Sequence, residues 1–387
     1  MARKPVPAAA SNSALKIDLF ESLGGAAKCR ELSTKFYARV AKDPTLRPLF
    51  PGKTFTCAIE ELSAFLVQFL GGPSGDTQRR WWLSLRDSHV RFQIGRKERD
   101  AWMGLMTRTL GEVEISDLMR SSLQTLFEDA SAYLVNTGPA AAAGAARLPE
   151  IHGQVARRWE QQRALDEAVA AVRVGEVADV ESPLLRELFE ANRAVFAHFV
   201  GLLIGSGHGE YALRVLSGNP DLAHERYSGR TLLHAASAAG DLAIVAMLLQ
   251  LGVDANILDD GGHAPLYSVG NECSKGGGAV VRALIENGAL VDACDGVKRC
   301  TALHMAARRD NVEVAGALLD CGAGIEARDS LGETPLRRAV NCGQGQVAAL
   351  LLVRGADPHS VGSKGLTPLL AARSAAMRSL LREWARA

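Results

Sequence analysis

The sequence lacks a strong net charge, a secretory signal and an apolar run long enough to cross a membrane. Over 387 residues, 44 Lys and Arg balance 43 Asp and Glu, so no global field favours nucleic acid, an anionic membrane or acidic substrates. The most apolar run, Val195 to Gly205, is far shorter than the roughly 18 to 20 residues that span a bilayer. Residues 1–18 carry basic side chains but no apolar stretch behind them. We therefore expect no membrane segment and no nucleic-acid partner.

The cysteines also lack a pairing pattern. They are seven, an odd number, with no CxxC pair, and they are spread through a long chain. Such usage is typical of reduced thiols in a cytoplasmic protein and argues against a disulfide framework or a zinc site. The residues concerned are Cys29, Cys57, Cys273, Cys294, Cys300, Cys321 and Cys342.

Composition changes along the chain and predicts two architectures. Thirteen of the 21 aromatic residues lie in 1–137, whereas 25 of the 38 glycines lie in 198–387. Between these parts, GPAAAAGAA at 138–146 is a low-complexity hinge. We expect the parts on either side of the hinge to fold independently. The predicted division is a disordered tail at 1–16, a helical domain at 17–137, a linker and helical segment at 138–197, and a repeat array at 198–387.

The segment before the array has a helical pattern but no readable function. Ser182 is the candidate N-cap and Pro183 the first helical residue, where a missing N–H costs nothing. Apolar residues then recur at helical spacing as far as Val200, which predicts helix throughout this stretch.

The last half of the chain repeats itself with a period of 33 residues, interrupted by one unit of 37. The long unit contains NECSKGGG at 271–278, which we expect to be a surface insertion between two helices. Glycines follow the second helix of most units and precede most unit starts, as left-handed caps and tight turns require. The turn before Thr301 lacks this glycine and has Val297-Lys298-Arg299 instead. The six units start near 198, 231, 264, 301, 334 and 367.

Starts such as Thr301-Ala302-Leu303-His304 and Thr334-Pro335-Leu336-Arg337 resemble the ankyrin repeat. The third position of each unit is apolar, so stacked units would join their apolar faces into one core. The resemblance implies an α-solenoid with short hairpin turns that binds an unknown protein partner. His234 and His304 occupy the same repeat position, and we expect them to bond neighbouring backbone groups rather than a metal.

Residues 17–137 have the apolar periodicity of helices throughout, broken at glycines and prolines. Five motifs then occur in one order: LFESLGG at 19–25, KFYARVAKDPTLRPLF at 35–50, FLVQFLGGP at 65–73, LRDSHVRFQIG at 85–95 and ERDAW at 98–102. Together they resemble the group II truncated haemoglobins. The resemblance implies an all-α, two-over-two globin fold around haem b, iron protoporphyrin IX.

Carried over motif by motif, the resemblance assigns His89 as the proximal ligand of the haem iron, the usual role of a neutral imidazole in globins. It places Phe50 on the haem face, where many relatives have tyrosine, and Arg86 near the haem propionates. A solvated surface role for Arg86 remains open. The resemblance assigns the cofactor pocket to Phe36, Phe50, Leu62, Arg86, His89 and Phe92.

The distal, gas-binding side is assigned in the same way. Tyr37 would put a hydroxyl near a bound ligand, and the Trp102 indole N–H can donate to the same ligand. Ala58 falls at the distal gate, where a small side chain predicts easy ligand entry.

Three hypotheses follow. The first is a haem protein that binds oxygen, or another diatomic gas such as nitric oxide or carbon monoxide, joined to a protein-binding scaffold as a gas or redox sensor. The second is a haem redox enzyme, a nitric oxide dioxygenase or a peroxidase-like protein, that needs an external reductase because the sequence has no reductase motif. The third is an interaction protein whose globin fold no longer binds haem; His89, Tyr37 and Trp102 argue against it. No residue is assigned a catalytic role.

Overall fold

The computed structural model describes residues 18–73, 84–137, 150–176, 182–362 and 365–384. The tail at 1–16 and the hinge at 138–146 lie outside these ranges. The chain forms two compact units, Met1–Asp166 and Glu167–Ala387. Both consist almost wholly of helices in their described parts, as the sequence predicts.

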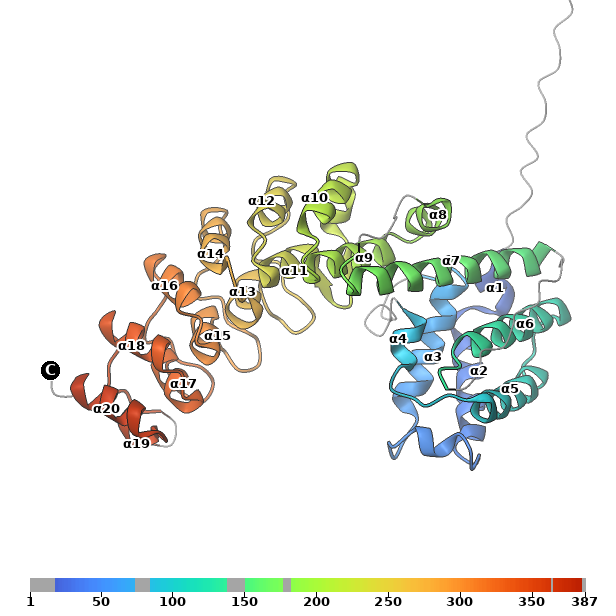
Figure 1. Ribbon diagram of the computed structural model, residues 1–387, viewed down its shortest axis with the longest axis horizontal. Coiled ribbons are helices and arrows are strands. Elements are labelled where there is room, and N and C mark those ends of the chain that lie inside the picture. Colours follow the sequence, from blue (N-terminus) through green and yellow to red (C-terminus); the bar gives the residue numbers. More distant parts are fainter. Residues whose placement is uncertain (1–17, 74–83, 138–149, 177–181, 363–364, 385–387) are drawn as a thin grey trace, which may run out of the picture. The chain divides into compact units, whose positions relative to one another are not determined.

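Two pairs of packed helices form the centre of the first unit (Figure 1). Helix α2 packs on α3, and α5 packs on α6, while α2 and α5 bring the pairs together. This arrangement is the two-over-two fold that the motifs imply. The helices are α1 (Leu19–Leu23), α2 (Gly25–Val40), the 3-10 helix η1 (Arg47–Leu49), α3 (Thr56–Phe69), α4 (Leu85–His89), α5 (Arg96–Gly111) and α6 (Asp117–Tyr133).

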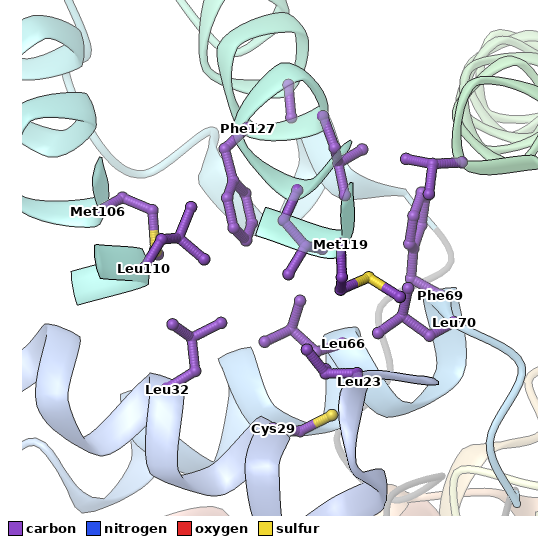
Figure 2. Packing of buried hydrophobic residues seen from close by; sticks show 14 of the residues in the cluster. Leu23, Cys29, Leu32, Leu66, Phe69, Leu70, Met106, Leu110, Met119 and Phe127 are labelled. Carbon is purple, nitrogen blue, oxygen red and sulfur yellow. The ribbon is translucent and has the colours of Figure 1, made fainter. Parts of the chain in front are cut away.

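The core of this unit is the set of apolar faces that the periodicity predicts. Leu32 of α2 and Leu66 of α3 are fully buried opposite Leu110 of α5 and Met119 of α6 (Figure 2). Fully burying a leucine or methionine side chain stabilises a fold by roughly 1.5 to 3 kcal/mol. These four residues lie on apolar helix faces of the kind that the periodicity predicts.

Two glycines of the motifs have specific backbone roles. Gly24 joins α1 to α2 with φ of 106°, a left-handed conformation that side chains disfavour. A Cβ on Gly72 would lie 2.6 Å from the ring of Phe20, so only glycine allows this close approach. These residues fix the entry to α2 and the exit from α3.

Helix α7 (Glu150–Arg173) continues the core of the first unit beyond the predicted globin range of 17–137. Val155 and Trp159 belong to the same buried cluster as the α2, α3, α5 and α6 side chains. The unit ends at Asp166, so the boundary between the two units falls within α7. Part of the helical segment expected within 138–197 therefore belongs to the core of the first unit.

Ser182 caps the next helix, and Pro183 is its first residue, as predicted. The helical pattern from 183 to 200 does not form one helix, however. The backbone breaks at Asn192, whose side chain accepts a hydrogen bond from the N–H of Val195 and so starts a new helix. The apolar residues keep their helical spacing across Asn192, so periodicity alone does not reveal the break between the two helices.

Six helix pairs follow one another in the second unit (Figure 1). The first helices of neighbouring pairs pack in one row, and most of the second helices pack in another. The first helices of the last five pairs begin within a few residues of the expected unit starts, whereas α9, the first helix of the array, begins at Arg193, before 198. The elements are α8 (Pro183–Ala191), α9 (Arg193–Gly205), α10 (Gly209–Gly218), the 3-10 helix η3 (Pro220–His224), β1 (Arg226–Tyr227), β2 (Arg230–Thr231), α11 (Leu232–Ala239), α12 (Leu242–Gln250), α13 (Pro265–Glu272), α14 (Gly277–Glu286), α15 (Ala302–Arg309), α16 (Val312–Asp320), α17 (Pro335–Cys342), α18 (Gly345–Val353), α19 (Pro368–Ala371) and α20 (Ala375–Trp384).

The two irregular places in the repeat pattern have local explanations. The segment 271–278 covers the end of α13, the connection to α14 and the start of α14. Glu272 and residues 274–276 are exposed, whereas Cys273, Gly277 and Gly278 are buried. Before Thr301, Arg299 adopts the left-handed conformation itself, with φ of 52°. The Asp295 carboxylate accepts the N–H of Lys298 at 2.6 Å and holds this turn without glycine.

Among the described helices, no single one is long and apolar enough to cross a membrane. The pair α8 and α9 passes a length and composition test only when the two are taken together, and they are bent by 117°.

Candidate functional site

The first unit encloses a cavity of about 950 Å³, a volume typical of sites for cofactor-sized ligands. Its walls come from α2, α3, α4, α5 and α6 and from the segment between α2 and α3. Seven of the predicted site residues line it together: Tyr37, Phe50, Ala58, Leu62, His89, Phe92 and Trp102.

His89 ends the short helix α4 and presents its imidazole to the cavity. Its Nδ1 lies 2.8 Å from the Leu85 carbonyl oxygen and 2.8 Å from the Ser88 hydroxyl. Because the Ser88 hydroxyl donates to the same carbonyl at 2.7 Å, Nδ1 carries the proton and donates. No described residue bonds Nε2. Burial lowers the pKa of His89, so the ring is held neutral, the form in which imidazole binds a metal.

Tyr37 of α2 and Trp102 of α5 line the same cavity, each held by aromatic neighbours. The ring of Phe36 packs against both, with centroids 5.1 Å from Tyr37 and 5.0 Å from Trp102. Neither the Tyr37 hydroxyl nor the Trp102 N–H has a hydrogen-bond partner among the described residues. Burial, with a smaller effect from the Glu61 carboxylate, raises the pKa of Tyr37, so its hydroxyl remains a donor.

Two of the predicted pocket residues do not line the cavity. Phe36 is fully buried and packs against the rings of Tyr37 and Trp102, which do line the cavity. Arg86 is exposed on α4, and its guanidinium lies 4.0 Å from the centre of the Tyr133 ring. This distance is that of a cation–π contact with α6, so in the structure Arg86 is turned to Tyr133 and not to the cavity lining.

Several lining residues were missed in the sequence. Lys53 and Arg91 are exposed cations at the cavity, and Glu61 adds a carboxylate to the same lining. Ser88 was missed as well, and its hydroxyl lies 2.8 Å from Nδ1 of His89. Arg91 follows His89 by two residues and Glu61 follows Ala58 by three, so helix and turn spacing around the motif residues could have indicated both.

The fold and this cavity define a small globin, joined to a solenoid of stacked helix pairs. A family model described as bacterial-like globin matches residues 18–135. Models described as ankyrin repeat and as ankyrin repeats (3 copies) match residues 228–260 and 269–362. The two architectures are thus those of known families.

The group 2 truncated hemoglobin YjbI of Bacillus subtilis (strain 168) is 33% identical over 106 residues, which are 27% of this chain and 80% of that protein. The chain therefore belongs to the group 2 truncated haemoglobin family through its N-terminal domain, and it carries ankyrin repeats at its C-terminal end.

Other relatives are larger proteins of varied kinds. The L-asparaginase of Dirofilaria immitis is 29% identical over 49% of this chain and 31% of its own length. The human ankyrin repeat and SOCS box protein 16 is 35% identical over 37% of this chain and 33% of its own length. This chain spans a third or less of these two relatives.

Proposed function

We propose that the first unit binds one haem b, with His89 Nε2 as the iron ligand. The single observation that carries this proposal is the state of His89: Nδ1 is occupied by Leu85 and Ser88, while Nε2 faces the cavity without a described partner. A neutral imidazole fixed in this tautomer is the proximal donor of globins. The bound group would supply a ferrous iron with one position open to a gas.

The lining suits a flat apolar macrocycle with charged edges. Phe50, Leu62 and Phe92 offer apolar surface, and Lys53 and Arg91 offer two exposed cations. We propose that these cations replace Arg86 as the partners of the propionates. Exposed ion pairs of this kind contribute little energy, so they orient the group more than they hold it.

Tyr37 and Trp102 supply two hydrogen-bond donors at the cavity. We propose that both donate to a diatomic ligand, oxygen above all, because bound oxygen carries more negative charge than bound carbon monoxide. Ala58, with its small side chain at the lining, leaves room for entry. Nitric oxide and carbon monoxide would bind at the same place.

For the whole chain we propose a gas or redox sensor in the cytoplasm whose ankyrin array binds a protein partner. The presence of a cavity in the first unit and of a repeat array in the second unit of one chain supports this idea.

A haem redox enzyme is the second candidate, favoured by the carboxylate of Glu61 beside the two donors at the cavity. Such activity requires electrons from a separate reductase. Steady turnover of nitric oxide or peroxide with an added reductase would favour this candidate, whereas reversible gas binding without turnover favours the sensor.

The proposal is tested by the absorption spectrum of the purified full-length protein, oxidised, reduced, and reduced with carbon monoxide. We expect a haem band at one haem per chain that shifts with carbon monoxide. A protein that remains colourless after incubation with haem would contradict the proposal.

A further inference from the structure

Helix α7 contributes a buried carboxylate, that of Asp166, to the first turn of α4, the helix that carries His89. Asp166 is 3% exposed, and its two oxygens accept the backbone N–H groups of Leu85 at 2.9 Å and Arg86 at 3.2 Å. Leu85 and Arg86 are the first two residues of α4, whose N–H groups have no partner within the helix. Asp166 therefore caps the helix that carries His89, from a site about 80 residues away in the sequence.

One peptide group connects this carboxylate to the histidine. The N–H of Arg86 and the C=O of Leu85 belong to the same amide. Its N–H donates to Asp166, and its carbonyl accepts the Nδ1 proton of His89 at 2.8 Å. An anion at the N–H end polarises an amide, which makes its carbonyl a stronger acceptor. A stronger acceptor at Nδ1 makes the imidazole a more basic ligand at Nε2.

Two further side chains hydrogen-bond the Asp166 carboxylate and fix its position. Gln162, one turn earlier in α7, donates to Asp166 at 2.8 Å, and the Tyr133 side chain bonds it as well. Burial raises the pKa of Asp166, while these hydrogen bonds oppose the rise. Each of the four donors stabilises the charged form of the carboxylate against the effect of burial.

We propose that Asp166 is a positioning residue for the haem iron, which acts through the Arg86–Leu85 amide on His89. This inference rests on the proposed haem site. Asp166 sets the orientation of the imidazole and increases its electron donation to the iron. A helix outside the region that the globin family model matches thereby influences the reduction potential of the haem iron. Loss of the charge weakens the iron–histidine bond.

The test compares full-length wild type with Asp166→Asn, which keeps an acceptor for the α4 N–H groups but removes the charge. Glu167→Gln is the matched control, because it removes the charge of the next residue of α7. The Glu167 side chain is exposed and makes no hydrogen bond to the side chains of α4 that the structure describes. The readouts are the iron–histidine stretching frequency of the ferrous protein, the haem reduction potential, and the rate of haem loss to a scavenger globin.

We expect Asp166→Asn to lower the stretching frequency, to raise the reduction potential and to speed haem loss by roughly 10- to 100-fold, the usual cost of removing an outer partner of a metal ligand. Glu167→Gln should match wild type. Asp166→Glu, which restores the charge, should return the frequency and the potential toward wild type.

An iron–histidine stretching frequency and a haem reduction potential equal to those of wild type in Asp166→Asn would overturn the inference. An uncharged cap on α4 would then be enough to give His89 its properties as a ligand. Equal shifts in Asp166→Asn and Asp166→Glu would also overturn it, because packing alone would explain them. If Asp166→Asn does not retain haem, Asp166→Ser, with a smaller acceptor, is compared in the same way. Failure of wild type itself to bind haem would instead reject the proposed function.

Discussion

Trp159 of α7 packs edge-on against Tyr133 of α6, with ring centroids 5.4 Å apart and ring planes at 89°. Tyr133 is the last residue of α6, and the family match ends two residues later. The aromatic pair therefore connects the helices that the globin family model matches to a helix that this model does not include. Pairs in this geometry contribute about 0.5 to 1.5 kcal/mol beyond the area they bury.

Trp159→Ala should lower the free energy of unfolding of the globin part by about 3 to 5 kcal/mol, the usual cost of removing a buried aromatic side chain. The measurement is urea unfolding of the haem-loaded protein followed at the haem absorption band. Val174→Ala, at a 75% exposed position just after α7, is the control and should have no effect. An unchanged midpoint in Trp159→Ala would show that α7 is not part of the globin core.

This finding changes the expectation that the chain divides cleanly at the hinge. A fragment that ends at Thr137 lacks Val155, Trp159 and Asp166, so we expect it to lose haem faster than a fragment that ends at Glu176. Haem transfer to a scavenger globin measures both rates. Equal rates of haem loss from the two fragments would show that the haem-binding part ends at the hinge and does not need α7.

Tyr37→Phe and Trp102→Phe should each speed oxygen release while changing carbon monoxide release less. A lost charge-assisted hydrogen bond of roughly 1.5 to 3 kcal/mol corresponds to about 10- to 150-fold in rate. Because both donors meet one ligand, the double variant should show less than the product of the single effects. Stopped-flow release measures these rates, and wild-type oxygen rates in both single variants would remove the residues from the gas site.

The array should lose stability in acid because it buries neutral histidines. His234 and His304 each bond a backbone carbonyl of the next repeat at 3.0 Å, as the sequence predicts. Burial lowers the pKa of both rings, and it lowers the pKa of His198 to about 4. The folded array thus binds fewer protons than the unfolded chain, whose histidines titrate near 6.5, so stability falls as the pH drops below about 6.5.

Each buried histidine should contribute a loss of up to about 1.4 kcal/mol per pH unit in that range. Urea unfolding between pH 7.5 and pH 4.5 measures the slope. His304→Asn should reduce the slope, and His359→Gln, at an exposed position, should leave it unchanged. A stability that is independent of pH across this range would contradict the buried neutral state.

Leu303→Asp should unfold the array, since it places a carboxylate at a position with no exposed area between neighbouring repeats. Leu290→Asp, at a residue 65% exposed, is the control and should fold normally. Far-ultraviolet circular dichroism reports the loss of helix, and we expect the haem band of soluble Leu303→Asp protein to persist. Loss of haem in that variant would show that the units depend on each other.

Local patterns predicted much of this molecule for a physical reason. Leu32 and Leu66 stand on single apolar faces, and the repeat units bury the same positions in turn, so periodicity alone reveals them. The role of α7 was hidden, because Asp166 meets Leu85 across 81 positions of sequence and no local pattern encodes such a contact. The contact of Arg86 with Tyr133 was hidden as well, because a motif indicates the helix but not the aromatic ring beside it.

The central claim is that His89 is the iron ligand, and its most direct test is chemical rescue of His89→Gly in the full-length protein. We predict that this variant binds no stoichiometric haem alone, and that added imidazole restores the haem band, because the free ring fills the space of the lost side chain. A His89→Gly protein with the wild-type spectrum in the absence of imidazole would contradict the account.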